Sequence, residues 1–554
     1  MLPRRLALGL FVPVLLILAG YVLYPSLRTF AVGLTPEHVA DVFSSWRSAN
    51  VRALINSLWI SVLSVLGAGV LGTALAYAFF RYRFPLRRVL MGLAVIPLAL
   101  PPLVGVLAFL FLYGESGILP RGLQRLFGLA DVPFAFDGLS AVWLVHVYSL
   151  YVYFYLFVAA ALRGIDRSLL EASAGLGASE WTTFFRVILP LIRPALVSAS
   201  LLVFMISMAS FTAPLLFAGT EPFLTTQIYS YKTNGNLDLS ATVSTVLTLI
   251  CLVFLIGIEL GGRRQVTGAG KGTSAPPRPL ESGWGQAVAL ALALTGLIFL
   301  FLPVATVVLI SFAEEGSWTF QILPQRYTLA NYTLLFQDPD VLAPILNSVR
   351  MALLATAANV VFGVAAALVI VKSVLPGRGA VRLLAVLPFA IPGTVIAVNL
   401  IVAFNEPGAL SFGQILVGTF WILPLAYFVR HIPLVVRATM ASLERYDDRL
   451  SEASADLGAP FRVTFWRVVL PLVGPGIVAG TLLTLVTALG EFVSSILLYI
   501  YSNRPISVEI LAQLRLFNFG AAAAYSVFLM LLIGLVTVLA SRLGGRTSAA
   551  QDVF

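Results

Sequence analysis

Long apolar stretches alternate with short polar segments along almost the whole chain. A helix needs about 20 mainly apolar residues to cross a hydrocarbon core of about 30 Å, and in lipid every backbone polar group must find its partner within the protein. The pattern therefore predicts an all-α membrane protein. About twelve transmembrane helices are expected, near residues 6–30, 54–80, 88–113, 139–162, 189–218, 240–262, 286–312, 346–371, 381–404, 410–436, 470–500 and 520–541.

One half-polar stretch occurs twice. It reads EASAGLGASEWTTFFRVILPLIRP from Glu171 to Pro194 and EASADLGAPFRVTFWRVVLPLVGP from Glu452 to Pro475, which is 281 residues later. Aligned without a gap, the two copies agree at 15 of 24 positions. Chance in a chain of this composition gives roughly two or three matches. The stretch is therefore an internal duplication.

The duplication extends to the whole chain. Asn56 opens one predicted span, and Asn347 opens another 291 residues later. Between the two sets of spans lies a segment rich in Gly, Pro and charge, which is typical of a linker. We therefore expect a first six-helix domain at 1–262, a cytoplasmic linker at 263–284 and a second six-helix domain at 285–554. Two parallel halves of this kind are expected to be related by a pseudo-two-fold axis along the membrane normal.

Composition agrees with this interpretation and predicts an orientation. The 554 residues are 59% hydrophobic and only 11% charged, whereas soluble domains carry about 25% charged residues. With both termini in the cytoplasm, 25 of the 35 Lys and Arg residues fall on the cytoplasmic side, which is the positive-inside asymmetry. The net charge of +10 is therefore explained by membrane topology, and no nucleic-acid partner is expected.

Two other features suggest chemistry that the residues do not support. The linker segment GAGKGTS has Gln265 and Gly272 where a phosphate-binding P-loop needs Gly and then Ser or Thr. The single Cys251 and the three widely separated His residues share no ligand spacing. We therefore expect no nucleotide site, no metal site, no cofactor and no catalytic residue in this chain.

Polar residues inside the spans are candidates for a translocation path. Glu491 lies in the predicted span 470–500, and Ser210 occupies the matching place in the first half. Charge is costly in lipid, and such residues usually line the path of a solute. A carboxylate there suits a cationic substrate. The alternative is a hydrogen-bonded packing residue, or one just beyond the end of its span.

The duplicated stretch is expected to form a small helix-turn-helix unit at the cytoplasmic membrane face. Glu171 and Glu452 suit the first turn of a helix, where a carboxylate favours the positive end of the helix dipole. Gly177 and Gly458 permit a tight turn after it. An amphipathic interfacial helix preserved by duplication is the alternative, but the agreement at Glu, Gly, Phe, Arg and Pro together favours paired protrusions that dock on a symmetric cytoplasmic partner.

Both copies resemble the coupling-loop signature of the membrane subunits of ATP-binding-cassette (ABC) importers. That signature is Glu-Ala-Ala, a Gly six residues after the Glu, then an aromatic residue and a Pro near nineteen residues after the Glu; here Ser173 and Ser454 replace the second Ala. The resemblance implies ATPase-coupling loops near 166–190 and 447–471. Their residues are Glu171, Ala172, Gly177, Phe184, Arg186, Pro190, Glu452, Ala453, Gly458, Phe465, Arg467 and Pro471.

The resemblance implies a fused two-domain permease of a type I ABC importer in the bacterial inner membrane. Its implied partners are two cytoplasmic ABC ATPase subunits and an external solute-binding protein. ATP hydrolysis is expected on the separate subunits, so the chain itself is not expected to be an enzyme.

Most of the chain looks most similar to the ferric iron importer group, through phrases such as RPISVEILAQLRLFNFGAAAAYSVFLMLL. Thiamine, aminoethylphosphonate and polyamine permeases remain open as alternatives. The alternative of another class is a secondary transporter of the major-facilitator type. Its basic motif between the second and third spans is replaced here by RYRFPLRR.

Overall fold

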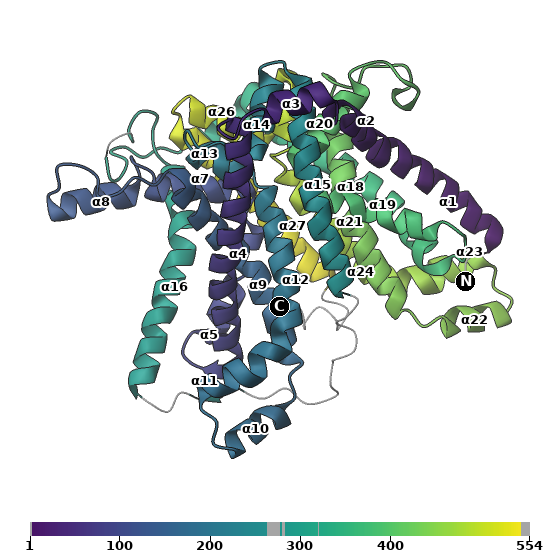
Figure 1. Cartoon of the computed structure of the whole chain (residues 1–554), viewed down its shortest axis with the longest axis horizontal. Helices are drawn as coiled ribbons and strands as arrows, with labels where there is room; N and C mark the ends of the chain where they lie inside the picture. The colour runs from purple at the N-terminus through teal and green to yellow at the C-terminus, as the bar shows by residue number, and fades with distance from the viewer. Residues whose placement is uncertain (1–2, 263–276, 280–282, 319–320, 545–554) are drawn as a thin grey trace.

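The structure is a computed structural model that describes residues 3–262, 277–279, 283–318 and 321–544. Helices dominate it (Figure 1), which confirms the predicted all-α membrane fold. Two short strands, β1 (Tyr82–Arg83) and β2 (Arg278–Pro279), form a parallel pair. Most of the predicted linker, including the GAGKGTS segment, lies outside the described residues.

The first half contains fifteen α-helices among its described residues. They are α1 (Arg4–Leu18), α2 (Tyr24–Gly33), α3 (Pro36–Phe43), α4 (Ala49–Arg81), α5 (Arg87–Leu93), α6 (Ile96–Ala99), α7 (Pro102–Tyr113), α8 (Ile118–Phe127), α9 (Gly138–Arg163), α10 (Arg167–Gly175), α11 (Glu180–Thr183), α12 (Leu189–Met208), α13 (Thr212–Phe217), α14 (Leu224–Thr233) and α15 (Leu237–Gly262).

The second half has a similar order, with twelve α-helices among its described residues. Its helices are α16 (Gly283–Ile310), α17 (Ala330–Gln337), α18 (Pro339–Lys372), α19 (Arg378–Ala390), α20 (Gly393–Phe404), α21 (Ile422–Arg445), α22 (Arg449–Asp456), α23 (Phe461–Thr464), α24 (Leu470–Leu489), α25 (Ser495–Leu498), α26 (Ile506–Arg515) and α27 (Phe519–Gly544). Short π-helical turns at Ala19–Leu23, Phe184–Ile188 and Phe465–Val469 and 3₁₀ turns at Ala409–Ser411 and Tyr501–Asn503 connect some of the helices.

The predicted number of membrane spans is confirmed. Among the described residues, eleven helical stretches are long and apolar enough to cross a membrane, or twelve if the bent pair α19–α20 is one span. Apolar side chains project outward from them: Leu66, Val70 and Val361 are 59%, 72% and 76% exposed. Such residues suit a lipid environment, because lipid imposes no cost on exposed apolar surface.

Two predicted spans are not continuous helices over the predicted residues. The stretch 88–113 is divided into α5, α6 and α7, because its prolines supply no backbone N–H and interrupt the helical hydrogen bonds. The stretch 410–436 begins too early, since α21 starts only at Ile422. Gly413 and Gly418 precede it with φ angles of 75° and 82°, which a right-handed helix does not allow.

Two further predicted spans are too long. The stretch 189–218 is helical as α12 only to Met208, and the stretch 470–500 as α24 only to Leu489. Beyond α24 the backbone N–H of Ser494 donates to the Glu491 carboxylate at 3.0 Å. Such side-chain bonds compete with helix continuation. Both breaks fall at the polar residues that the sequence singled out.

The first span of each half reaches across to the other half. Helix α1 packs on α18 and α19 of the second half, and α16 packs on α5 and α7 of the first half as well as on α27 of its own (Figure 1). Tyr21 donates to the carbonyl oxygen of Leu410 at 2.8 Å, and Tyr148 donates to that of Leu300 at 3.1 Å. Each half therefore completes its packing with a helix from the other.

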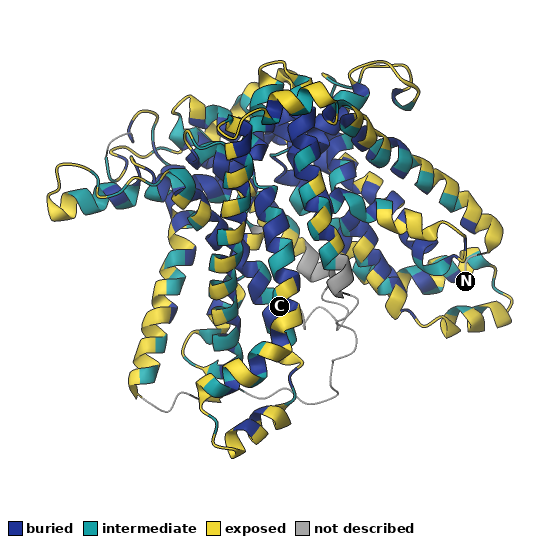
Figure 2. Ribbon diagram, viewed as in Figure 1, coloured by how far each residue is buried: buried dark blue, intermediate teal, exposed yellow. Residues whose placement is uncertain are grey.

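The bundle has two different ends. One end, here called the loop side, carries α10 and α22, and the other, the far side, carries α3, α14 and α26 (Figure 1). The two halves diverge toward the loop side, and Figure 2 shows buried residues gathered where the halves meet nearer the far side. Phe211 and Phe492, which are 281 residues apart, contact each other with ring centroids 6.0 Å apart. Matching residues of the two halves therefore meet.

Candidate functional site: two repeated loops and a polar centre

The two repeated loops, residues 166–190 and 447–471, have the same backbone. Gly177 follows α10 with a φ of 73°, and Gly458 follows α22 with a φ of 81°. In the first loop the N–H of Gly177 bonds Ala174 O at 2.9 Å and the N–H of Ala178 bonds Ser173 O at 3.1 Å, with equivalent bonds in the second loop. This pattern is the Schellman helix ending, which favours glycine in the left-handed conformation.

A pair of hydroxyl groups braces each loop internally. Ser173 Oγ lies 2.8 Å from Thr183 Oγ1, and Ser454 Oγ lies 2.8 Å from Thr464 Oγ1. The bond joins the first short helix of each loop to the second. The Ser residues are those that depart from the Glu-Ala-Ala signature, so the structure gives this departure a physical role that the sequence did not reveal.

The second helix of each loop continues into a membrane span. A π-helical turn at Phe184–Ile188 links α11 to α12, and the matching turn at Phe465–Val469 links α23 to α24. Pro190 and Pro471 lie at the second position of α12 and α24, where a helix tolerates a missing N–H. Glu171 is not in the first turn of its helix, which begins at Arg167, whereas Glu452 is in the first turn of α22.

The predicted loop residues have matching exposure in the two copies. Phe184 and Phe465 are partly buried against the cores, whereas the other ten are exposed, namely Glu171, Ala172, Gly177, Arg186, Pro190, Glu452, Ala453, Gly458, Arg467 and Pro471. Sequence reasoning missed Leu176 and Leu457, the residues before the two turn glycines. Both are 89% exposed, although their identity in the aligned copies was visible.

The two loops are anchored to their spans differently. Glu180 in the first loop accepts from Nε and Nη2 of Arg81 at 2.9 and 2.6 Å and lies 3.2 Å from Nη1 of Arg278 in β2. In the second loop Phe461 occupies the position of Glu180, and Lys372 replaces Arg81. Lys372 Nζ instead pairs with Asp448, 2.7 Å away, just before α22. The first loop is thus held at its second helix and by the linker, and the second loop at the start of its first helix.

Ser210 lies just beyond α12 in an uncharged polar cluster. Its Oγ is 2.8 Å from Nε2 of the buried His146. Nδ1 of the same ring is 3.1 Å from the hydroxyl groups of Ser64 and Ser207. Both ring nitrogens are therefore engaged in hydrogen bonds with neighbouring helices.

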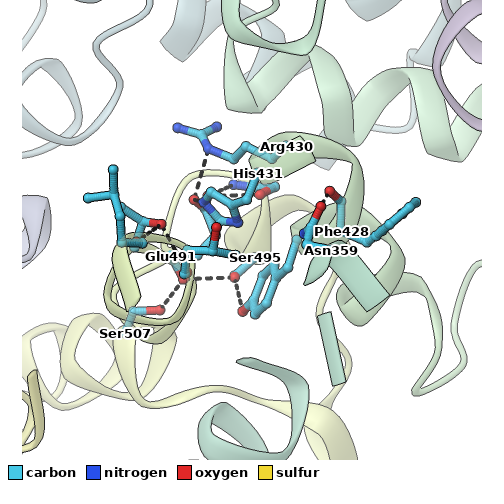
Figure 3. A network of polar contacts seen from close by, with 12 residues as sticks. Asn359, Phe428, Arg430, His431, Glu491, Ser495 and Ser507 are labelled. Atoms are coloured by element: carbon cyan, nitrogen blue, oxygen red, sulfur yellow. Dashed lines mark hydrogen bonds and ion pairs between the residues drawn. The ribbon is translucent and has the colours of Figure 1, made fainter. Parts of the chain in front are cut away.

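Glu491 lies at the matching break beyond α24, where it forms an ion pair (Figure 3). It is 5% exposed, and its Oε2 is 2.9 Å from Nε of Arg430 on α21. Its Oε1 accepts from the hydroxyl of Ser494 at 2.8 Å, and its carbonyl oxygen accepts from Ser495 and Ser507 at 2.9 and 2.7 Å. Sequence reasoning missed Arg430, although a single Arg inside an apolar span was as visible as Glu491.

The described residues contain no group of three or more His, Cys, Asp or Glu side chains that could hold a metal ion. The Glu491 carboxylate is balanced by a guanidinium and does not stand alone. The polar centre therefore combines an ion pair between the buried Glu491 and the partly exposed Arg430 in the second half with the hydrogen-bonded His146 cluster in the first half.

Comparison with known proteins identifies the family. The model of the family described as binding-protein-dependent transport system inner membrane component matches the chain twice, at residues 68–261 and 359–548. The chain belongs to this family. The duplicated match also confirms that this permease carries two transport domains in one chain, as a multi-pass inner membrane protein.

Individual relatives resemble the permease over different lengths. A probable ABC transporter permease of Sinorhizobium fredii is 29% identical over 92% of this chain and 90% of its own. The ferric transport system permease protein FbpB of Actinobacillus pleuropneumoniae is 27% identical over 96% of this chain and 77% of its own. The spermidine/putrescine transport system permease PotB of Escherichia coli is 32% identical over 44% of this chain and 94% of its own. The permease is therefore similar to ABC permeases at full length and at half length.

Proposed function

We propose that the loop side of the permease faces the cytoplasm and that loops 166–190 and 447–471 dock two ABC ATPase subunits, which hydrolyse ATP. The observation that carries this proposal is a pair of loops with the same backbone and the same exposed leucine on one side of the bundle. An external solute-binding protein then delivers substrate at the far side. The two transport domains are 1–262 and 285–554, joined by the linker 263–284.

The connection from each loop to the polar centre supports a mechanical role. Each loop is braced by its Ser–Thr bond and is continuous with a 20-residue helix, α12 or α24, which is about 30 Å long. Ser210 and Glu491 lie just beyond the far ends of these helices. When the ATPase subunits close, they draw α10 and α22 together, and the two helices transmit that movement to the translocation path between the halves.

Charge at the exposed leucines is expected to prevent ATPase docking. Because both side chains are 89% exposed, Leu176→Glu with Leu457→Glu places no charge in a core and costs little stability. We expect the double variant to reach the membrane in normal amount but to lose copurification of the ATPase subunits by about tenfold or more, as for interface hot spots. Leu516→Glu, at an exposed position between α26 and α27, is the control. Equal recovery of the ATPase subunits with wild type, the double variant and Leu516→Glu refutes docking at these tips.

The proposed substrate is ferric iron. Full-length similarity to a ferric transport system permease supports this assignment, whereas similarity to a spermidine/putrescine permease covers less than half of the chain. Membership of a binding-protein-dependent family argues against the major-facilitator alternative. Ser210 and Glu491 remain the proposed residues of the translocation path.

Uptake by a deletion strain tests the substrate. We expect loss of the gene to abolish binding-protein-dependent ⁵⁵Fe(III) uptake and growth under iron limitation, and the wild-type gene to restore both. Uptake of radiolabelled spermidine should be unchanged in the same strain. If the deletion strain takes up iron normally but no longer takes up spermidine, the permease is assigned to the polyamine group instead.

A further inference from the structure

An unusual helix start lies inside the second half, beside Glu491. Helices α19 and α20 meet at 113°, so α20 begins within the protein at Gly393, after Pro392, whose side chain provides no cap. The first N–H groups of a helix have no partner within that helix, and they carry the positive end of its dipole. Helix α20 is 12 residues long, and its N-terminus therefore favours a negative charge.

The guanidinium of Arg430 lies against this same helix start. A Cβ atom added to Gly393 would stand 1.5 Å from Arg430 Nη1 and 3.2 Å from Val493 Cβ. Glycine is therefore the residue that admits the guanidinium here. A cation at the positive end of a helix dipole is unfavourable unless an anion accompanies it.

Hydrogen-bonding groups at this place remain unused. Thr394 is fully buried, and its Oγ1 has no partner among the described residues; Nη1 of Arg430 also has none. Glu491 engages the Nε edge of the guanidinium and leaves Nη1 without a partner. Unpaired buried polar groups are costly, so the hydroxyl of Thr394 and the guanidinium beside the neighbouring Gly393 favour a polar ligand at this helix start.

The arrangement breaks the internal symmetry. At the positions that match Gly393 and Thr394, 291 residues earlier, the first half has Pro102 and Leu103; at the position that matches Arg430, 281 residues earlier, it has Ser149. If these residues only stabilised a fold that both halves share, the two halves would not need different residues at these positions. Because the adjacent Gly490 approaches Pro101 of the first half, the cluster lies at the junction of the halves, where the cargo must pass.

We propose that Arg430, Thr394 and the start of α20 bind a negatively charged oxygen group, such as a carboxylate or phosphate of a chelate that carries the ferric ion. This inference rests on the proposed iron function and deepens it, since it makes the cargo an anionic complex and not a bare cation. Arginine and helix N-termini are the groups that recognise such anions. The Glu491 carboxylate holds the guanidinium in place from its other edge.

Thr394→Val tests the site without disturbing the fold. Removal of an unpartnered buried hydroxyl does not destabilise a protein, so we expect an unchanged or higher melting temperature together with about a tenfold loss of ⁵⁵Fe(III)-citrate uptake. Thr439→Val is the matched control, because Thr439 on α21 is equally buried and its hydroxyl is also without a partner. It should leave uptake unchanged. Equal uptake in Thr394→Val and wild type overturns the proposal.

Anion binding without iron separates the site from the substrate assignment. The permease in lipid nanodiscs should melt at a higher temperature with citrate than with chloride at equal ionic strength, because a ligand that binds the folded state stabilises it. The neutral pair Arg430→Gln with Glu491→Gln, like Thr394→Val, should lose this difference. Stabilisation by inorganic phosphate but not by citrate overturns the chelate assignment. If citrate raises the melting temperature but the permease does not transport iron, the anion site is supported and the iron function is rejected.

Discussion

Replacement of both Gly177 and Gly458 by Val is expected to reduce uptake by about tenfold or more while ATP hydrolysis continues. Nothing lies within 4 Å of a Cβ added at either glycine, so space does not limit the substitution. The left-handed backbone does, because it costs an L-residue roughly 1–2 kcal/mol, and a β-branched residue is the least tolerant. Each loop then relaxes to another turn and no longer transmits force. ATPase rate and uptake, measured together in proteoliposomes of the whole transporter, check this prediction.

Asparagine at the same two positions is the informative comparison. Asn adopts the left-handed conformation more readily than other non-glycine residues, so the double Asn variant should retain most of its coupling. Gly175→Ala, at the helical end of α10 with open space around it, should behave as wild type. Unchanged uptake in the double Val variant at normal expression contradicts the coupling role of the loops.

Arg430→Ala is expected to destabilise the permease by roughly 3 kcal/mol, the scale for leaving a buried charge without its partner, because Glu491 is buried although Arg430 is partly exposed. Glu491 is only 5% exposed, and in the variant its carboxylate has lost its cation. The hydrogen bonds from Ser494 do not supply the missing charge. The expected results are a lower melting temperature in nanodiscs and a lower yield of monodisperse protein. The effect should be independent of salt, because bulk ions do not screen a buried group well.

Removal of the carboxylate should reverse that loss. In Arg430→Ala with Glu491→Gln no charge remains buried, so the melting temperature should return most of the way to that of wild type. Uptake should not recover with it, because the guanidinium is still missing. If the single variant Arg430→Ala is as stable as wild type, the ion pair has no structural role.

Much of the fold follows from hydropathy and from the duplication. The long apolar runs predict the spans because lipid leaves the backbone little alternative to a helix. The errors lie where conformation depends on something hydropathy does not measure. Proline positions divide the stretch 88–113, glycines with positive φ delay α21, and polar side chains near Ser210 and Glu491 end α12 and α24. The packing of α1 and α16 on the opposite half has no sequence signal, because apolar helices can pack on many partners.

The candidate site divides in the same way. The turn glycines could be predicted because a local backbone motif carries its own residue pattern. The Ser–Thr braces could not, since they join residues ten positions apart across a turn of unknown shape. Glu491 was visible as a charge in an apolar run, but its partner depends on how α21 packs on α24. Thr394 gave no signal, because its importance arises from the bend that brings its neighbour Gly393 against Arg430.

The packing of α1 on the second half has a consequence for biosynthesis. Tyr21 bonds a carbonyl oxygen 389 residues further along the chain, and at about 5–20 residues per second that partner is synthesised roughly 20–80 s later. Until then, α1 is inserted in the bilayer with its contact surface facing lipid or another helix. A nascent chain interrupted after its first six spans is therefore expected to be a substrate for membrane quality control, and a split gene would have to deliver both products to the same place at the same time.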